Sequence, residues 1–175
     1  PVTRVRGPVR ATALALVAAA GLAAACDDGF GPIRWEATPD TATLYSLARP
    51  ELLGLPSAYD FVNLLPVRVE SPGATGQWDV ALTEEAGTLA LLPAGAVGTL
   101  PARAGIAVMR GRPFEAVDRA PGDTAAYERR RPVPVETGVV YVVRTAPRIS
   151  SGCTYFAKVQ PLVVDAVAGL FRFVV

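Results

Sequence analysis

The densest group of side chains that could bind a ligand is a run of three arginines, Arg129, Arg130 and Arg131, and three more arginines lie between residues 110 and 119. Guanidinium groups bind phosphate and carboxylate oxygens in a bidentate geometry. The run is therefore a candidate anion patch for a phosphate, a lipid head group or an acidic glycan. The alternative is a solvated loop that nearby acids, such as Asp118 and Glu128, neutralise.

Acidic side chains could serve as a pair in general acid–base hydrolysis. Asp60, Glu70 and Asp79 could do so only if the fold brings two of them together across a cleft. Glu84 and Glu85 lie in a predicted turn, where water would solvate both and leave neither pKa suited to catalysis. A carboxylate-based envelope hydrolase is thus the enzymatic alternative, and we assign no catalytic residue.

Lys158 is the only lysine in the chain. A lysine can activate a serine, here Ser150 or Ser151, but the alternating pattern around Lys158 predicts the solvent side of a half-buried strand. The chain contains no histidine, which excludes Ser-His-Asp and Cys-His nucleophiles, HExxH zinc sites and histidine-ligated haem. A net charge of +1 argues against nucleic-acid binding. We therefore expect no metal and no cofactor.

The N-terminus has the organisation of an export signal. Three arginines within residues 1–10 precede twelve uncharged and mostly apolar residues, 11–22, and three alanines then lead to Cys26. Twelve helical residues span about 18 Å, well short of the hydrocarbon core of a bilayer. The pattern therefore predicts a helical signal peptide over residues 1–25 and not a permanent membrane span.

The segment Leu22-Ala23-Ala24-Ala25-Cys26 resembles the lipobox of bacterial lipoproteins. The resemblance implies cleavage before Cys26, a diacylglyceryl thioether on its sulfur, and acylation of its amino group. Ala23 stands where the family pattern has leucine, and Leu22 lies one place further out. An anchor of several acyl chains is stable in a membrane.

We therefore expect residues 26–32 to form a lipidated tether, in either the inner or the outer membrane. An unlipidated, secreted β-domain that differs only at Cys26 is the alternative. With Cys26 lipidated, Cys153 would be an odd thiol in an oxidising compartment. It would then be a free buried thiol or would form a disulfide with a cysteine beyond Val175. The last residues read as an unfinished strand, so we expect the domain to be truncated at its C-terminus.

Beyond the tether, apolar residues recur with a period of two, which is typical of β-strands. Pro and Gly, 16 of each, interrupt nearly every helical pattern. The pattern predicts an all-β fold, an antiparallel β-sandwich or barrel-like single domain, over residues 33–175. The predicted strands cover residues 41–47, 67–70, 77–83, 88–91, 105–110, 133–145, 155–165 and a last run through Phe171 and Phe173.

Some elements can be predicted in more detail. Residues 84–87 should form a hairpin turn, because Gly87 readily adopts a positive φ. Residues 139–143 are apolar on both faces and fit a central strand covered on both sides. Pro161 indicates a bulge or an edge position. Residues 49–57 and 113–118 could each hold one helical turn.

Residues 139–145 and 155–159, with the sequences VVYVVRT and YFAKV, are similar to a hairpin of haemophore-type β-sheet lipoproteins. That resemblance implies a sheet. Such proteins are expected to hold haem through histidines, which this chain lacks, so no haem site follows.

The function that these patterns favour is a lipid-anchored protein of the cell envelope with a binding or structural role and no catalysis. Its expected partners are the membrane, through Cys26, and an envelope protein or glycan.

Overall fold

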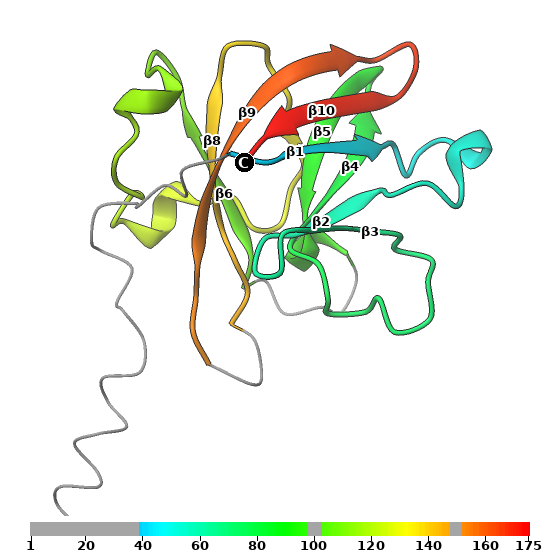
Figure 1. Ribbon diagram of the computed structural model, residues 1–175, viewed down its shortest axis with the longest axis horizontal. Coiled ribbons are helices and arrows are strands. Elements are labelled where there is room, and N and C mark those ends of the chain that lie inside the picture. The colour runs from blue at the N-terminus through cyan, green and yellow to red at the C-terminus, as the bar shows by residue number, and fades with distance from the viewer. Residues whose placement is uncertain (1–38, 98–102, 148–151) are drawn as a thin grey trace, which may run out of the picture.

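The computed structural model describes residues 39–97, 103–147 and 152–175, which fold as a β-sandwich of two five-stranded antiparallel sheets (Figure 1). The all-β prediction is confirmed. The first sheet has the order β1 (Thr41–Tyr45), β10 (Leu170–Val174), β9 (Phe156–Asp165), β8 (Val140–Arg144) and β6 (Gly105–Met109). The second sheet has the order β3 (Leu65–Val67), β2 (Ala58–Asp60), β4 (Val80–Glu85), β5 (Thr88–Pro93) and β7 (Val133–Pro134).

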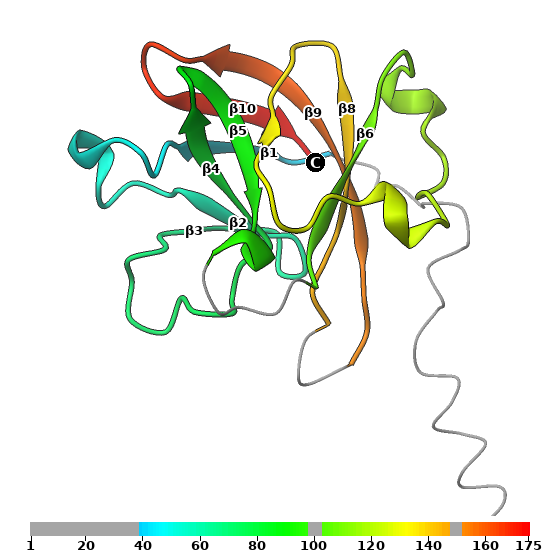
Figure 2. The ribbon, with the colours of Figure 1, turned by 180° about the vertical axis from the view of Figure 1, so that it is seen from behind.

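The described helical structure consists of short 3-10 turns: η1 (Pro50–Leu52), η2 (Ala94–Ala96), η3 (Phe114–Ala116) and η4 (Thr124–Ala126). Two of them, η1 and η3, lie in the segments for which a helical turn was predicted. Seen from behind, η3 and η4 belong to the long connection that runs from β6 to β7 on the outside of the first sheet (Figure 2).

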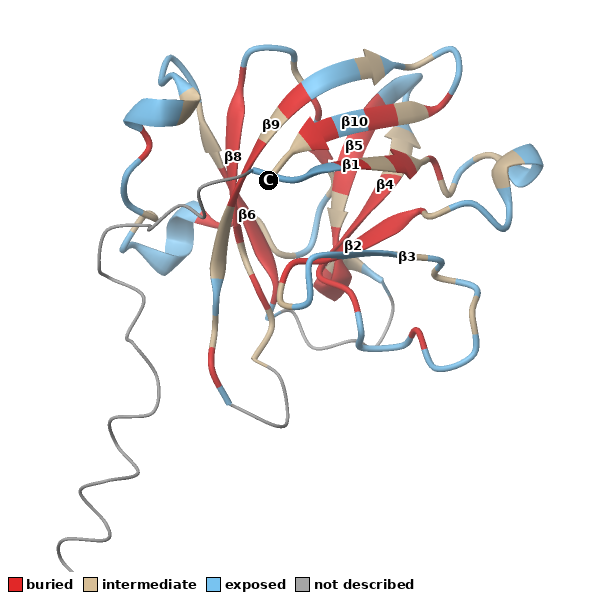
Figure 3. Cartoon of the chain, in the orientation of Figure 1, coloured by how far each residue is buried: buried red, intermediate tan, exposed pale blue. Residues whose placement is uncertain are grey.

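The two sheets share one apolar core. Alternate residues of strands in both sheets are buried between them, as Figure 3 shows in red. The ring of Phe173 lies 5.0 Å from that of Phe171 and 5.4 Å from that of Tyr59, which joins the first sheet to the second. Aromatic pairs at such distances add about 0.5–1.5 kcal/mol to the hydrophobic contribution.

The β4–β5 hairpin is tighter than predicted. Glu84 and Glu85 are the last residues of β4, and only Ala86 and Gly87 form the turn, with φ values of 50° and 79°. Two successive positive φ angles are what a two-residue hairpin requires in order to match the twist of its strands. The placement of both glutamates in the turn was therefore wrong.

The predicted strand over residues 133–145 is two strands. β7 pairs with β5 in the second sheet, whereas β8 lies between β6 and β9 in the first. A turn at residues 136–139 separates them, with Gly138 at a φ of 79°. The central part of the prediction is confirmed, because residues 140–143 are fully buried.

The bulge predicted at Pro161 is present, although β9 is not an edge strand. Phe173 pairs with Pro161 and Arg172 pairs with Val163, so Leu162 is the extra residue. Because the bulge breaks the alternation, two neighbouring apolar residues face solvent: Leu162 is 49% and Val163 44% exposed.

Arg49 fastens the β9–β10 hairpin of the first sheet to β4 of the second. Its Nε donates to Glu84 Oε1 at 2.5 Å, and its two terminal nitrogens donate to the carbonyls of Val167 and Ala166 at 2.6 Å each. Gly169 lies directly against it: a Cβ there would be 2.8 Å from Arg49 Cδ. The absence of a side chain at Gly169 therefore makes room for the arginine.

Both edge strands of the second sheet contain a proline, Pro66 in β3 and Pro134 in β7. The backbone N–H of Val135 donates to Leu89 of the neighbouring strand. Because backbone N–H groups alternate in direction along a strand, the nitrogen of Pro134, one residue before Val135, points away from the sheet. As a proline nitrogen it carries no proton, so it cannot donate to another strand.

Candidate functional site

The predicted anion patch lies at the end of the β6–β7 connection. The backbones of Ile106 and Glu128 exchange two hydrogen bonds of 2.9 Å, which hold the start of the arginine run against the edge of β6. The three arginines therefore directly follow a residue that is hydrogen-bonded to the sheet. Each of the three has different surroundings.

Glu128 organises this loop. Its Oε1 accepts hydrogen bonds from the backbone N–H groups of Arg129, Arg130 and Arg131 at 2.9, 2.9 and 3.2 Å. Its Oε2 accepts from Nε and Nη2 of Arg131 at 3.0 and 2.8 Å. These bonds, led by the one from the Arg130 backbone, lower the pKa of Glu128 to about 2. The glutamate is thus always ionised near neutral pH and neutralises Arg131.

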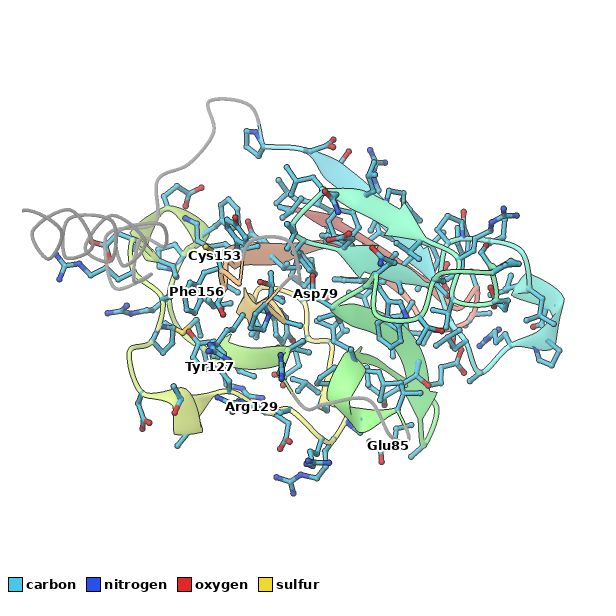
Figure 4. The ribbon with its side chains drawn as sticks, turned by 90° about the horizontal axis from the view of Figure 1, so that it is seen from below. Asp79, Glu85, Tyr127, Arg129, Cys153 and Phe156 are labelled. Carbon is cyan, nitrogen blue, oxygen red and sulfur yellow. The ribbon has the colours of Figure 1, made fainter. Side chains whose placement is uncertain are left out.

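The side chain of Arg129 packs against the protein surface. Its Nη2 donates to the carbonyl of Thr124 at 3.1 Å, and its Cγ would lie 3.0 Å from a Cβ added at Gly105. Its Nε is buried and, among the described residues, has no hydrogen-bond partner. Figure 4 shows Arg129 next to Tyr127 on the same side of the molecule. Arg130 is exposed, so it is the arginine of the patch best placed to meet an anion.

A groove of about 420 Å³ adjoins the patch. Two of its lining arginines are paired with carboxylates: Arg131 with Glu128, and Arg110 with Glu136. Glu85 also lines the groove. An anion entering the groove would therefore meet carboxylates as well as guanidinium groups, which weakens its attraction to this surface.

Glu85 and Glu128 both line this groove, but they do not match what hydrolysis needs. A general acid requires a raised pKa, whereas hydrogen bonds lower the pKa of Glu128 to about 2. Glu84, which was expected to be solvated in a turn, is bonded by Arg49 instead, and that bond lowers its pKa. Its pairing could not be predicted, because Arg49 is distant in the sequence.

Asp79 is fully buried and holds the two sheets together. Its Oδ2 accepts from the backbone N–H of Phe61, beside β2, and its Oδ1 accepts from that of Ala146, beyond β8, both at 3.0 Å. Asp60 is 4% exposed and accepts from the backbone N–H groups of Val62 and Asn63 at 2.9 and 3.2 Å. Both carboxylates thus have a structural use that sequence spacing did not reveal.

A second groove, of about 510 Å³, lies over β2 and β3. Its size is within the range of small-molecule sites. It contains Asp60 but neither Glu70 nor Asp79, so it holds no pair from the predicted acidic set. Arg68 and Gln77 line it and are exposed, together with proline rings and short aliphatic side chains. This composition can bind a ligand through hydrogen bonds, but it offers no acid–base pair.

The prediction for Lys158 was wrong: the residue is 0% exposed. Its Nζ donates to the carbonyl of Phe114 at 2.7 Å and lies 4.5 Å from the centre of the Phe114 ring. Burial lowers its pKa to about 8, partly offset by Glu115 and Asp118. Alternation places Lys158 on the outer face of the sheet, as predicted, but the β6–β7 connection covers that face. Ser150 and Ser151 lie outside the described residues.

Cys153 is 9% exposed and disulfide-bonded. The chain contains one other cysteine, Cys26, which lies outside the described residues, as do the signal peptide and the tether predicted around it.

Within the described ranges, no group of three or more His, Cys, Asp or Glu side chains is arranged to hold a metal ion. No helix in the same part of the chain is long and apolar enough to span a bilayer. No family model, curated protein or solved structure matches this chain.

Proposed function

We propose that this chain is a lipid-anchored protein of the cell envelope that acts by binding and does not catalyse a reaction. The observation that carries the anchoring is the segment Leu22-Ala23-Ala24-Ala25-Cys26 after a basic and then apolar stretch. In this proposal residues 26–32 form a short tether between the lipid and the folded domain.

The non-catalytic part of the proposal is supported by how the acids are used. Asp79 and Asp60 accept hydrogen bonds from the backbone, and Glu84 and Glu128 are bonded to arginines. Hydrogen bonds lower the pKa of Glu84 and Glu128, so these two carboxylates are held ionised and are poorly suited to donating a proton. The groove over β2 and β3 is the better binding site of the two, because Arg68 and Gln77 are exposed within it.

The test is fractionation of cells that express the wild-type chain or Cys26→Ser, with the intact mass measured on each product. We expect the wild type in the membrane fraction with a mass that fits an acylated Cys26, and the variant released from it. Cys153→Ser is the matched control and should stay in the membrane. An unacylated wild-type mass, or retention of Cys26→Ser, would overturn the proposal.

One observation favours the unlipidated, secreted domain as a second candidate. Cys153 is disulfide-bonded. A partner cysteine beyond Val175 would leave Cys26 free to be lipidated, whereas Cys26 itself as the partner would not. One sulfur cannot carry both a thioether and a disulfide. Intact mass separates the candidates, because reduction adds two hydrogens to a disulfide-bonded chain and leaves a thioether unchanged.

A further inference from the structure

A short part of the β6–β7 connection covers Lys158. Residues 111–122 are called the flap here. They follow β6 closely and begin at Gly111, which adopts a φ of 69°. Phe114, Val117 and Ala120, spaced by three, are the flap residues that pack on the outer face of the first sheet. Side-chain hydrogen bonds join the flap to neighbouring described residues, from Lys158 Nζ to Phe114 O and from the Tyr127 hydroxyl to Pro121 O.

The surface under the flap is lined by apolar side chains of the described residues, with the amine of Lys158 among them. It is formed by side chains of β6, β8 and β9 and by the aromatic ring of Tyr127: Ala107, Met109, Val140, Val142, Phe156 and Tyr127. Among the described residues, Glu115 and Asp118 are charged groups near the amine, and both are exposed residues of the flap itself. Tyr127, whose ring is part of this surface, is itself titratable, but burial raises its pKa to about 12, so it stays neutral.

We propose that residues 111–122 form a flap that opens locally, and that protonation of the Lys158 amine beneath it promotes the opening. A protonated amine is far better solvated in water than under an apolar cover, so its charge favours the open flap. A neutral amine keeps its hydrogen bond to Phe114 without that penalty. The flap is therefore held most weakly when Lys158 is charged and most firmly when it is neutral.

Because Lys158 is the only lysine, its acylation reports flap opening. The purified full chain is treated with a small acylating reagent, and modification of the peptide that contains Lys158 is followed by mass spectrometry. The same protein unfolded in guanidinium chloride at each pH is the reference, and the ratio of the two rates measures protection. Opening should raise the pKa of Lys158 from about 8 to its ordinary 10.5. Protection should thus increase about 100-fold between pH 8 and pH 10.5. Protection that changes by less than about threefold would overturn the proposal.

Two variants separate the flap from global unfolding. Val117→Ala removes a fully buried flap contact and should increase labelling at every pH while the ratio between the two pH values stays the same. Leu82→Ala weakens the core between the sheets and should leave labelling unchanged. Labelling that follows Leu82→Ala would show that Lys158 reacts only after global unfolding, and this result also contradicts the proposal.

Flap opening can also be measured without labelling the Lys158 amine. Trypsin can cleave after Arg119 on the flap once the flap has detached from the sheet. Lys158→Met keeps a long unbranched side chain, one atom shorter than that of lysine, and removes its charge. At pH 8 or below we expect cleavage after Arg119 to be slower in this variant than in the wild type. Equal or faster cleavage in a folded Lys158→Met protein would contradict the proposal, and the wild-type labelling decides it if the variant does not fold.

Discussion

The carboxylate of Asp79 accepts a hydrogen bond of 3.0 Å from the backbone N–H of Ala146, and this contact joins the start of β4 in one sheet to the end of β8 in the other. The same carboxylate accepts from Phe61 at 3.0 Å and has no exposed surface. This buried carboxyl group thus connects the start of β4 with the residue after β2 and with the segment after β8.

Asp79→Ala should strongly destabilise the fold, because it leaves two buried N–H groups without their acceptor. Each such loss costs about 1–3 kcal/mol, so we expect a decrease of about 2–5 kcal/mol in the free energy of unfolding, measured in urea. Asp165→Ala is the matched control, because Asp165 accepts from Ala168 at 2.8 Å on the exposed β9–β10 turn. If both variants lose the same small amount, the bridging role of Asp79 is refuted.

Glu128→Gln should change both stability and anion binding. The folded pKa of Glu128, about 2, lies below its ordinary value of 4.5, so its contribution is complete above pH 4.5 and is lost as the pH falls toward 2. The wild-type urea midpoint should fall over this range more steeply than that of Glu128→Gln.

The same substitution removes the charge that neutralises Arg131. Retention on a heparin column should therefore increase in Glu128→Gln and be lost again when Arg129, Arg130 and Arg131 are also changed to Ala. Unchanged retention in both variants would show that the arginine run contributes nothing to anion binding.

Lys158→Met should stabilise the protein near neutral pH. The folded pKa of Lys158, about 8, lies below 10.5, so between these values the unfolded chain binds more protons and wild-type stability rises with pH. A shift of this size corresponds to about 3 kcal/mol. We expect the variant to exceed the wild type by up to about this amount below pH 8, with a difference that shrinks toward pH 10.5. Parallel stability curves would count against this account of the buried amine.

Gly169→Ala should disturb Arg49 as well as the turn. Its φ of 65° disfavours any side chain, and an added Cβ would lie 2.8 Å from Arg49 Cδ. Gly138→Ala is the matched control, because Gly138 has a φ of 79° but nothing within 4 Å of an added Cβ. Each should lose about 1 kcal/mol from the positive φ, and Gly169→Ala should lose more, in thermal unfolding. Equal losses would mean that Arg49 moves aside freely.

Much of the fold could be predicted because its strands obey simple local rules. A period of two identified the β class, residues 139–143 indicated a central strand by being apolar on both faces, and Pro161 indicated the bulge. The division of residues 133–145 between two sheets could not be predicted, because periodicity does not reveal which strands pair.

The candidate site was less accessible to sequence reasoning. Alternation says which face of a strand a residue is on, but not whether another segment covers that face, so Lys158 was placed in solvent. The partners of Glu84 and Asp79 lie 35 and 67 residues away in the chain. The role of Glu128 could be predicted, because the residues it bonds are the next three in the chain and its closeness to the arginines is visible in the sequence.

The prolines of β3 and β7 affect whether the sheets of neighbouring molecules can pair edge to edge. A strand approaching either edge of the second sheet would meet Pro66 or Pro134, which cannot donate a backbone hydrogen bond to it. Growth by sheet-to-sheet polymerisation is thereby discouraged at both of these edges. If a lipid anchor confines many copies to one plane, local concentrations become high, and these two residues help to keep neighbouring molecules separate.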